Sequence, residues 1–490
     1  MEQDAALKRY SLMVAAASAF LTPFMGSSVN LAIPSIGHEF SANAYMLSWV
    51  ATSYILASAA FLLPFGRLAD IVGRKKIFLA GMLSFCLSSI LCGLAWSIES
   101  LIAFRVLQGI GSAMIFGTGM AILTSIFPPQ ERGKVLGINV AFVYVGLSMG
   151  PVLGGTLNHN LGWHSIFLLT ALIAVFVILL TLAKLKGEWV GARGEKYDLG
   201  GAALYVIGLV ALMYGFSSVS ASEWARYLLA LGLVLMLVFV RREINMQQPL
   251  INLRLFSGNA AFTFSNLAAL INYSATFAVG FLLSLHLQVV MGYDSQAAGL
   301  ILLSQPVLMA VLSPFAGKFS DRVEPRVLAS GGMLLTTLGL VSLCFISEAM
   351  PLWLLIVNLA VLGIGFALFS SPNSNAVMSA VEKRFYGVAS STLGTMRLLG
   401  QALSMAIVTM VLAMYVGRIE LTAADTGQLL SGARMAFIIM AVLCFGGIFA
   451  SMARGNVRPA NGNGMPPGPP PGAQARGQGG PPTGRDGDKS

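Results

Sequence analysis

Residues 66–76 read GRLADIVGRKK, and residues 317–326 read GKFSDRVEPR. Each stretch is a basic turn that begins with glycine, carries an aspartate four residues later and lies between two long apolar segments. Only 10% of the residues in this chain are charged, so a repeated charged turn is a strong signal. Two such turns, about half a chain apart, indicate that the chain consists of two related halves.

The composition places most of the chain in a membrane. Of its 490 residues, 56% are hydrophobic, and the charged fraction lies far below the roughly 25% of a soluble protein. A transmembrane helix needs about 20 apolar residues, and the period-2 alternation of a β-barrel is absent. The sequence therefore predicts an all-α integral membrane protein with fourteen transmembrane helices. The predicted spans are 12–34, 45–66, 77–97, 101–124, 135–157, 164–184, 199–218, 225–241, 259–287, 298–317, 327–347, 352–375, 389–414 and 432–453.

Basic residues gather on one side of the predicted membrane. If the N-terminus is cytoplasmic, only Arg226, Arg418 and Arg434 fall on the opposite side, apart from arginines inside helices. Because lysine and arginine mark cytoplasmic loops, we expect both termini in the cytoplasm. Topology and contact with anionic lipid account for the net charge of +10, so no nucleic-acid partner is expected.

The chain divides into five predicted parts. Residues 1–11 form a cytoplasmic N-terminus, and residues 12–184 form a six-helix bundle. A charged loop and an inserted helix pair occupy 185–241, and a second six-helix bundle occupies 242–453. Residues 454–490 are rich in proline and glycine and predict a disordered cytoplasmic tail, because they cannot bury a core.

The repeated turn is suited to a tight connection between two helices. Gly66 and Gly73 permit a tight turn and close helix approach. Asp70 can cap a helix N-terminus or pair with nearby arginines, and Arg74 belongs to the same turn. The second copy supplies Gly317 and Asp321.

The stretch RVLQGIG, which begins at Arg105, places an arginine inside a predicted helix. Such a residue costs about 2.5–3.5 kcal/mol on insertion scales, so we expect it to face a polar cavity or a partner. Because Arg105 lies near the start of its helix, snorkelling to the interface is the alternative.

The stretch GLSMGPVLGG begins at Gly146. Its glycines Gly146, Gly150 and Gly154 share one helix face at four-residue spacing, which lets a neighbouring backbone approach closely. Pro151 removes a backbone hydrogen bond and can kink the helix. Gly155 adds a second small residue at the end of the motif.

These motifs, in this order, resemble the major facilitator superfamily, and specifically its fourteen-helix drug:proton antiporter branch. The resemblance covers roughly residues 10–453 and includes the shorter matches YDLG at 197–200 and LQVVMG at 287–292. It implies two six-helix bundles plus an inserted pair. It also implies a first turn that latches the cytoplasmic side, an Arg105 that handles protons, and a glycine motif that marks antiporters.

The resemblance further implies a function and a location. We expect a multi-pass protein of the bacterial-type inner membrane that exports small apolar or drug-like molecules by alternating access. Its partners would be the small-molecule substrate, the lipid bilayer and protons, and a monomer is expected. Cysteine and histidine residues lack metal-ligand spacing, so no metal, cofactor or enzyme activity is predicted.

The first helix departs from the pattern of this branch. Where the family carries LDxTIVNVALP, residues 24–34 read FMGSSVNLAIP, so Met25 stands at the acidic position. None of the 20 carboxylates falls in the middle of a predicted helix, although a buried carboxylate is suited to carry a proton. Three explanations stay open. Coupling uses an end-of-helix acid such as Asp70 or Asp198, or it uses His286, or the protein is an uncoupled facilitator.

Polar residues within the apolar helices are the candidates for a substrate cavity, because an unsatisfied buried polar group is costly. Hydrogen bonding between helices is the alternative for each. The predicted cavity contains Arg105 and Arg397 but no carboxylate. Because acidic residues attract cationic drugs, this composition favours neutral or anionic substrates. The candidates are Asn30, Tyr54, Gln108, Asn272, Tyr273, Gln305, Asn373, Asn375, Arg397 and Gln401.

Other function classes remain open at this stage. Import of a small metabolite and a transporter-like membrane sensor both fit the same helices. The sequence contains no GxxxxGK[ST] stretch, so ATP hydrolysis at a P-loop is not expected to drive it.

Overall fold

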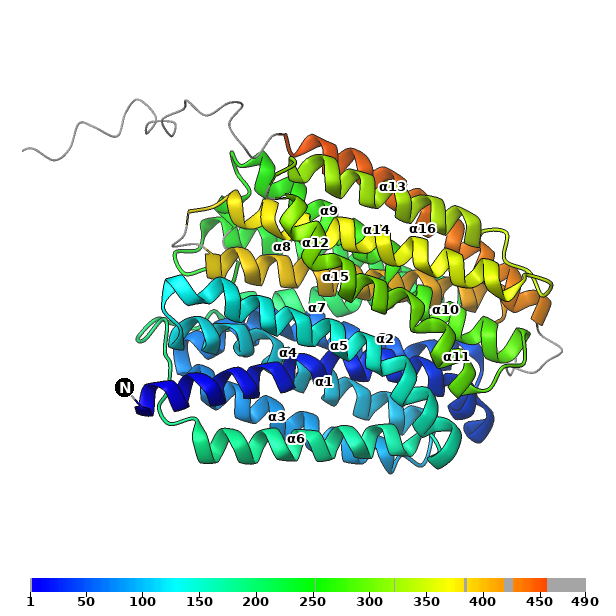
Figure 1. Ribbon diagram of the computed structural model, residues 1–490, viewed down its shortest axis with the longest axis horizontal. Coiled ribbons are helices and arrows are strands. Elements are labelled where there is room, and N and C mark those ends of the chain that lie inside the picture. Colours follow the sequence, from blue (N-terminus) through cyan, green and yellow to red (C-terminus); the bar gives the residue numbers. More distant parts are fainter. Residues whose placement is uncertain (1, 252, 321, 383–385, 418–425, 456–490) are drawn as a thin grey trace, which may run out of the picture. The chain divides into compact units, whose positions relative to one another are not determined.

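The computed structural model describes residues 2–251, 253–320, 322–382, 386–417 and 426–455 (Figure 1). These residues belong to one compact unit, Met1–Val457. Every regular element in them is helical, as the composition predicts. Asp321 and residues 456–490 of the predicted tail lie outside the described residues.

Six long helices form the first half of the chain. Helix α1 packs along α5, α2 and α3 both pack along α4, and α6 packs along α3 and α1. Several of these helices are longer than the apolar spans that predict them, because a helix continues past the roughly 20 residues that cross the hydrocarbon. The bounds are α1 Glu2–Phe40, α2 Ala44–Val72, α3 Arg74–Gly93, α4 Ile98–Ile126, α5 Pro129–Leu161 and α6 His164–Lys184.

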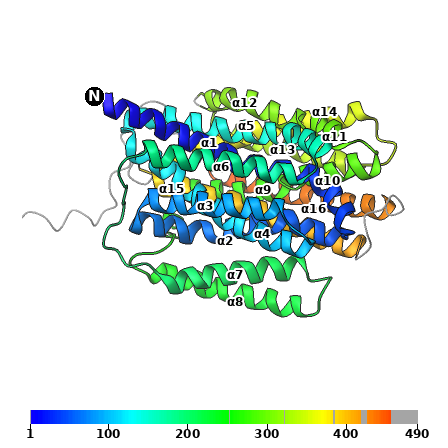
Figure 2. The same ribbon diagram turned by 90° about the horizontal axis from the view of Figure 1, so that it is seen from below.

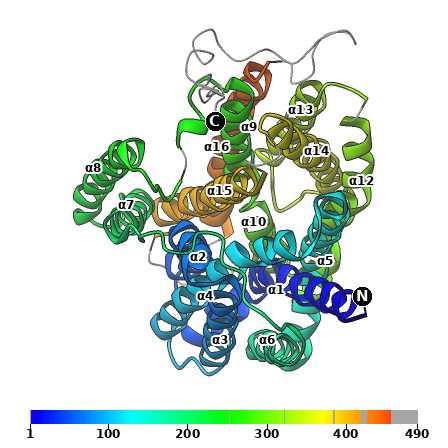
Figure 3. The ribbon, with the colours of Figure 1, turned by 90° about the vertical axis from the view of Figure 1, so that its left-hand side faces the viewer.

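The inserted pair comprises α7 (Leu199–Ser217) and α8 (Trp224–Asn245). Helix α7 packs against α8 on one side and against α2 and α15 on the other, so the pair lies at the flank of the helices in Figure 2 and Figure 3. Many apolar side chains of α8 are exposed, including those of Leu233 and Leu237, as expected of a helix that faces lipid.

The second half again contains six spans, but two of them are divided. The ninth predicted span is α9, α10 and a π-helical turn, η2, and the tenth is α11 followed by α12. The bounds are η1 Leu253–Leu255, α9 Ala260–Thr276, α10 Val279–Leu285, η2 His286–Val290, α11 Ser295–Leu302, α12 Ser304–Ser320, α13 Pro325–Leu343, α14 Leu352–Ser379, α15 Tyr386–Tyr415 and α16 Thr426–Ala453.

The two breaks have physical causes. At the first, the buried backbone N–H of Ala278 donates to Ser404 Oγ of α15 at 3.1 Å. Irregular backbone at membrane depth is tolerated where the protein supplies such a partner. At the second, Pro306 follows Leu303 closely and has no N–H to offer the carbonyl of Leu302, so a continuous helix would lose a hydrogen bond there.

Thirteen spans of the described residues are long and apolar enough to cross a membrane, with α9–η2 and α11–α12 each counted as one. Helix α8 is not among them but has 22 residues, which is enough to cross a bilayer. Thirteen spans and α8 make the fourteen helices that the sequence predicts. The residue bounds of the five predicted parts and the cytoplasmic termini stay predictions.

The two halves meet along three sets of helices. Helix α2 packs against α15, α5 packs against α11 and α12, and α1 packs against α10. We call the ends of the helices on the side of Glu2 the inner ends and the opposite ends the outer ends (Figure 1).

Candidate functional site

The first turn motif ties three helices of the first half together. Asp70 lies near the C-terminal end of α2, and Arg74 is the first residue of α3. Arg74 Nε donates to Asp70 Oδ1 at 2.8 Å, and Arg74 Nη1 donates to the carbonyl oxygen of Ala121 in α4 at 3.0 Å. In this conformation the charged groups of Asp70 and Arg74 are therefore paired with each other inside the first half of the chain.

Gly73 is required by the backbone of this turn. Its φ of +132° lies in the region that favours glycine. A Cβ at this position would come within 2.6 Å of the carboxyl carbon of Glu188. The N–H of Arg74 also donates to the carbonyl oxygen of Trp189 at 2.9 Å. The charged loop after α6 thus lies directly on the turn.

More contacts join that loop to the end of α2. The N–H groups of Gly191 and Ala192 donate to the carbonyl oxygen of Asp70 at 3.0 and 2.8 Å. Arg67 forms an ion pair with Glu195. We call residues 185–198 the clamp loop, because it holds the turn between α2 and α3 by backbone and side-chain bonds. The sequence predicts a charged loop here but gives no sign of its partner, which is more than a hundred residues away.

The other glycines of the two turns differ in their packing. A Cβ at Gly66 would meet no heavy atom within 4 Å, so the close approach predicted there does not depend on its missing side chain. Helix α4 does come near, since a Cβ at Gly117 would lie 3.4 Å from Gly66 Cα. At Gly317 of α12, a Cβ would come within 2.8 Å of Ser371 Oγ in α14.

Arg105 is buried inside the first half, with 1% of its surface exposed. Its Nε donates to the carbonyl oxygen of Val50 at 2.9 Å, and its Nη1 donates to Gln108 Oε1 at 2.5 Å. Gln108 in turn donates to Ser89 Oγ at 2.7 Å, and the guanidinium lies 4.2 Å from the ring centroid of Tyr54. The sequence leaves two alternatives for Arg105, a buried partner or snorkelling to the interface. The buried position and the hydrogen bonds of its guanidinium agree with the first. Gln108 and Tyr54 belong to the same cluster.

The glycine face of α5 is seated on α1. A Cβ at Gly146 would come within 2.5 Å of the carbonyl oxygen of Phe20, and a Cβ at Gly154 within 2.7 Å of Ser28 Cα. A Cβ at Gly150 would come within 2.5 Å of an Oγ atom of α1. Small residues are therefore needed along this whole face.

Pro151 frees one carbonyl group of α5, and α1 supplies its donor. The helical partner of the Leu147 carbonyl would be the N–H of residue 151, which proline lacks. Ser27 Oγ donates to that carbonyl oxygen at 3.2 Å, and Ser28 Oγ donates to the carbonyl oxygen of Gly150 at 3.1 Å. The proline thus creates a polar joint between two membrane helices.

The same stretch of α5 also meets the second half. A Cβ at Gly155 would collide with the backbone carbonyl of Ser295 in α11, and a Cβ at Gly299 would collide with that of Pro151. Ser295 Oγ donates to the carbonyl oxygen of Gly155 at 3.0 Å. Helix α5 is therefore in backbone contact with α1 and with α11 at once.

Two further hydrogen bonds join the halves toward their outer ends. The hydroxyl groups of Thr52 in α2 and Thr409 in α15 lie 3.1 Å apart. Ser284 Oγ of α10 donates to the backbone carbonyl oxygen of Asn30 in α1 at 2.7 Å. The half-buried Asn30 thus lies at the junction of the halves.

Arg397 lies in a polar and aromatic region of the second half. Its Nη2 donates to Ser374 Oγ of α14 at 2.9 Å, and its Cζ lies 5.7 Å from the ring centroid of Tyr273 in α9. Tyr273 packs edge-on against Phe366, with ring centroids 5.3 Å apart. Arg397 itself is half-buried.

The remaining cavity candidates differ in their hydrogen bonding and their burial. Asn373 Nδ2 donates to the carbonyl oxygen of Ser265 at 3.1 Å, and Asn375 Nδ2 donates to Ser320 Oγ, so both join helices to one another. Asn272 is fully buried, and neither atom of its amide has a partner among the described residues. Gln305 of α12 and Gln401 of α15 are half-buried.

The candidates for proton coupling lie in different surroundings. Asp198 caps α7 by accepting from the N–H of Gly201 at 2.9 Å, and Arg242 donates to it at 2.8 Å. The hydrogen bond from Arg242 is the main reason why the pKa of Asp198 lies below its ordinary value. His286 lies in η2 with 2% of its surface exposed, and neither ring nitrogen has a partner in the described part of the chain.

Met25, at the position where the family carries an acid, is fully buried. Thr170 Oγ1 of α6 lies 3.8 Å from its sulfur atom. Within this half, the site of the missing carboxylate is therefore a packed contact between α1 and α6.

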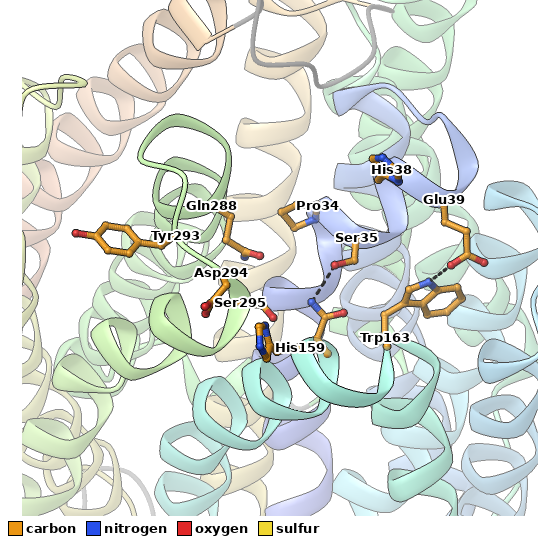
Figure 4. Close-up of a pocket in the computed structure, with 12 residues that line it drawn as sticks. Pro34, Ser35, His38, Glu39, His159, Trp163, Gln288, Tyr293, Asp294 and Ser295 are labelled. Carbon is orange, nitrogen blue, oxygen red and sulfur yellow. Dashed lines mark hydrogen bonds between the residues drawn. The ribbon is translucent and has the colours of Figure 1, made fainter.

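A pocket of about 670 Å³ lies at the outer side, between the two halves (Figure 4). Trp163 Nε1 donates to Glu39 Oε2 at 2.7 Å at its edge, and Asn158 Nδ2 donates to Ser35 Oγ at 2.9 Å. The sequence does not predict this pocket, since its residues come from three distant segments. Its lining is Pro34, Ser35, His38, Glu39, Asn158, His159, Gly162, Trp163, Gln288, Tyr293, Asp294 and Ser295.

Two histidines that look scattered in the sequence, His38 and His159, thus line the same pocket. His164 Nε2 lies 3.6 Å from Glu39 Oε1 nearby. No group of three or more His, Cys, Asp or Glu residues that could hold a metal ion occurs among the residues that the structure describes.

Two related helical halves, joined by glycine-rich backbone contacts and enclosing polar side chains, define a membrane transporter. The chain belongs to the Major Facilitator Superfamily, whose family model matches residues 15–241 and 265–477. It is a multi-pass protein of the cell membrane, of the bacterial inner-membrane type.

Several curated relatives are similar over most of the chain. The riboflavin transporter RibZ of Clostridioides difficile (strain 630) is 29% identical over 441 residues, covering 90% of this chain and 96% of the relative. The cephamycin export protein CmcT of Amycolatopsis lactamdurans is 34% identical, covering 81% and 83%. The multidrug resistance protein Stp of Mycobacterium tuberculosis (strain CDC 1551 / Oshkosh) is 32% identical, covering 79% and 72%.

A solved structure has the same fold. It is that of a bacterial homologue of the human lysosomal transporter Spinster, in an inward-facing and unoccupied conformation. The TM-score is 0.68 at 16% identity, and the match covers 91% of this chain and 97% of that one.

Proposed function

We propose that this transporter is a secondary exporter of small apolar or drug-like molecules, working by alternating access in exchange for protons. The double backbone contact of α5 carries the proposal. Gly146, Gly150 and Gly154 seat it on α1, while Pro151 and Gly155 meet α11. One helix thus links the two halves, as a rocking motion requires. The names of two relatives, a multidrug resistance protein and a cephamycin export protein, agree with export.

The outer ends form the closed gate of this conformation. The bonds Thr52–Thr409 and Ser295–Gly155 hold the halves together there. Substrate enters from the inner side and reaches the polar and aromatic residues between the halves. The halves then rock apart at their outer ends, the outer bonds break, and substrate leaves through the outer pocket.

Among the coupling candidates, His286 is the proton carrier that we favour. It is buried in a divided helix, and both ring nitrogens lack a partner within the described residues, so a change of conformation can offer it one. Asp70 and Asp198 are held in ion pairs with Arg74 and Arg242. Arg105 keeps its charge, because guanidinium groups hold their proton in proteins.

An uncoupled facilitator or an importer of a small metabolite is the second candidate function. Two observations favour it. Met25 replaces the acid of the first helix, and the relative RibZ is named a riboflavin transporter. A transporter-like sensor would bind ligand without moving it.

Efflux measurements separate these functions. Cells that express the protein are loaded with fluorescent drug-like compounds, and efflux is followed with and without a protonophore. Efflux that stops with the protonophore supports proton exchange, and efflux that continues supports a facilitator. If the compounds accumulate in intact cells but not in everted vesicles, the protein imports them rather than exporting them. If no compound moves in either system, the proposed transport of such compounds is contradicted.

His286→Gln is compared in the same assay with His164→Gln, which changes a half-buried histidine that does not line the outer pocket. We expect proton-driven efflux to fall in the first variant, while substrate exchange without a proton gradient persists. Equal coupling in both variants would reject His286 as the carrier.

A further inference from the structure

The two arginines that the sequence places inside the helices differ in how their charge is satisfied. Arg105 donates to the Val50 carbonyl and to Gln108, and its surface is 1% exposed. Arg397 is half-buried, and its side chain bonds to Ser374 alone among the described residues, through Nη2. The Nε of Arg397 is buried and has no partner there. Within the described part of the chain, Arg397 therefore keeps unused donors.

Among the residues that the structure describes, no carboxylate forms an ion pair with Arg397. The ion pairs in the described part of the chain lie near helix ends and in loops, and none includes Arg397. A charge within a membrane is costly unless it faces a partner or a polar cavity. A guanidinium with free donors is suited to a carboxylate or sulfonate, which it can bind with two parallel hydrogen bonds.

The surroundings of Arg397 are aromatic and apolar. The Tyr273 ring lies beneath its guanidinium, and Phe366 packs against that ring. Tyr273 and Phe366 form one apolar cluster with Met309. A ligand that places an anionic group on Arg397 would therefore have its body next to aromatic rings.

This region also reaches across the junction of the halves. Tyr144 and Leu147 of α5 pack against the cluster of Tyr273, Met309 and Phe366. The hydroxyl of Tyr144 lies 3.2 Å from Ser370 Oγ, one helical turn before Ser374. A ligand bound here would touch both halves, as a transported substrate must.

We propose that Arg397 is a substrate-binding residue for the anionic group of an aromatic organic acid. This inference deepens the proposed export function and rests on it. The class of substrate is an amphiphile with one negative charge and an aromatic body. The carboxylates of the described helices lie near the helix ends, so none is placed to repel such an anion, whereas a cationic drug would find no counter-charge there.

The test uses matched sets of probes on the purified, detergent-solubilised protein. Naphthalene and biphenyl are each taken as the carboxylate, the primary amide and the aminomethyl cation, and Kd is measured at neutral pH by calorimetry. We expect the carboxylates to bind most tightly. Arg397→Gln should weaken their binding by about 10- to 100-fold, as loss of hydrogen bonds to a charged group predicts, and should leave the amides within about twofold.

Arg434→Gln is the matched control. Arg434 is an exposed arginine near the outer end of α16, and its Nε donates to the Ile346 carbonyl. The Arg434→Gln variant removes one positive charge that lies away from the cluster around Arg397. The preference for the carboxylate probes should therefore remain. If Arg397→Gln does not fold, Arg397→Lys replaces it, and a weaker but persistent carboxylate preference is expected.

Two results would overturn the inference. One is wild-type protein that binds the three forms of each probe equally, and the other is an Arg397→Gln variant that keeps the carboxylate preference. Efflux of the same probes from cells tests the export function separately. Binding of the carboxylates without their efflux would overturn export and retain the anion site. Efflux of all three forms without a preference for charge would overturn the anion site and retain export.

Discussion

Gly155 of α5 and Ser295 of α11 are in backbone contact across the junction of the two halves. Ser295 Oγ donates to the carbonyl oxygen of Gly155 at 3.0 Å, and the space that a Cβ of Gly155 would need is taken by the Ser295 carbonyl. Because the obstacle is backbone, a flexible side chain cannot move aside to admit a larger residue. The contact between the two halves at this point therefore depends on glycine at position 155.

Gly155→Ala should open the outer gate. The added methyl group should destabilise this conformation by about 1–3 kcal/mol, the usual cost of overpacking. A cysteine placed at Thr409, which is buried at the junction, should then react faster with a membrane-impermeant maleimide, and efflux should fall. The control is Gly331→Ala, since a Cβ at Gly331 of α13 meets nothing within 4 Å. Equal labelling rates in both variants would reject the gate.

Asp70→Asn should abolish transport while the protein remains inserted. The change removes the negative partner of Arg74, whose guanidinium also bonds to α4, so the turn loses its charge pairing. Efflux and membrane abundance are measured together. Glu99→Gln, an exposed carboxylate in the first turn of α4, serves as the control. Normal efflux in Asp70→Asn would remove the gating role.

The clamp loop should depend on the pair of Arg67 and Glu195. Glu195→Arg places two like charges together, and we expect slower efflux and a slightly lower Tm. The pair is partly exposed, so the change in stability should be on the order of 0.2–1 kcal/mol. The double variant Arg67→Glu with Glu195→Arg restores opposite charges and should recover most of the efflux. A double variant no better than the single one would contradict the contact.

Arg105→Lys should lose most of the transport activity. An ammonium group cannot bond to the Val50 carbonyl and Gln108 in the same fork geometry while lying over the Tyr54 ring. Arg105→Ala should also lower stability, because a buried unpaired acceptor costs about 1–3 kcal/mol. Efflux and Tm are compared with those of Arg226→Lys, an exposed arginine in α8. Full activity in Arg105→Lys would restore the snorkelling alternative.

The ion pair of Asp198 and Arg242 should give a pH-dependent stability. Arg242 lowers the pKa of Asp198 in the folded protein, so the pair stabilises the fold above the ordinary aspartate pKa of about 3.9. That contribution is lost as pH falls through the lowered folded value. The Tm of Arg242→Gln should therefore lie below that of the wild type at pH 7, and the difference should shrink in acid. A difference that is constant down to pH 3 would contradict the assignment.

Much of the fold follows from local properties of the sequence. The length and apolarity of each segment predict the spans, because crossing a bilayer requires about 20 apolar residues wherever they occur in a chain. The four-residue spacing of Gly146, Gly150 and Gly154 predicts a close helix contact, since such spacing places all three on one face. The prediction that Arg105 faces a partner follows in the same way from the cost of a charge in a membrane.

Only the tertiary structure decided which segments meet. It placed the clamp loop on the turn at Gly73, and it brought His38 and His159 to one outer pocket. It divided the ninth span where Ser404 supplies a hydrogen bond. It also placed Arg397 beside Tyr273, with its Nε lacking a partner among the described residues. Each of these depends on contacts between residues far apart in the chain. Hydropathy and spacing describe a segment and its own faces, whereas the partner of each face is fixed by how all the helices pack together.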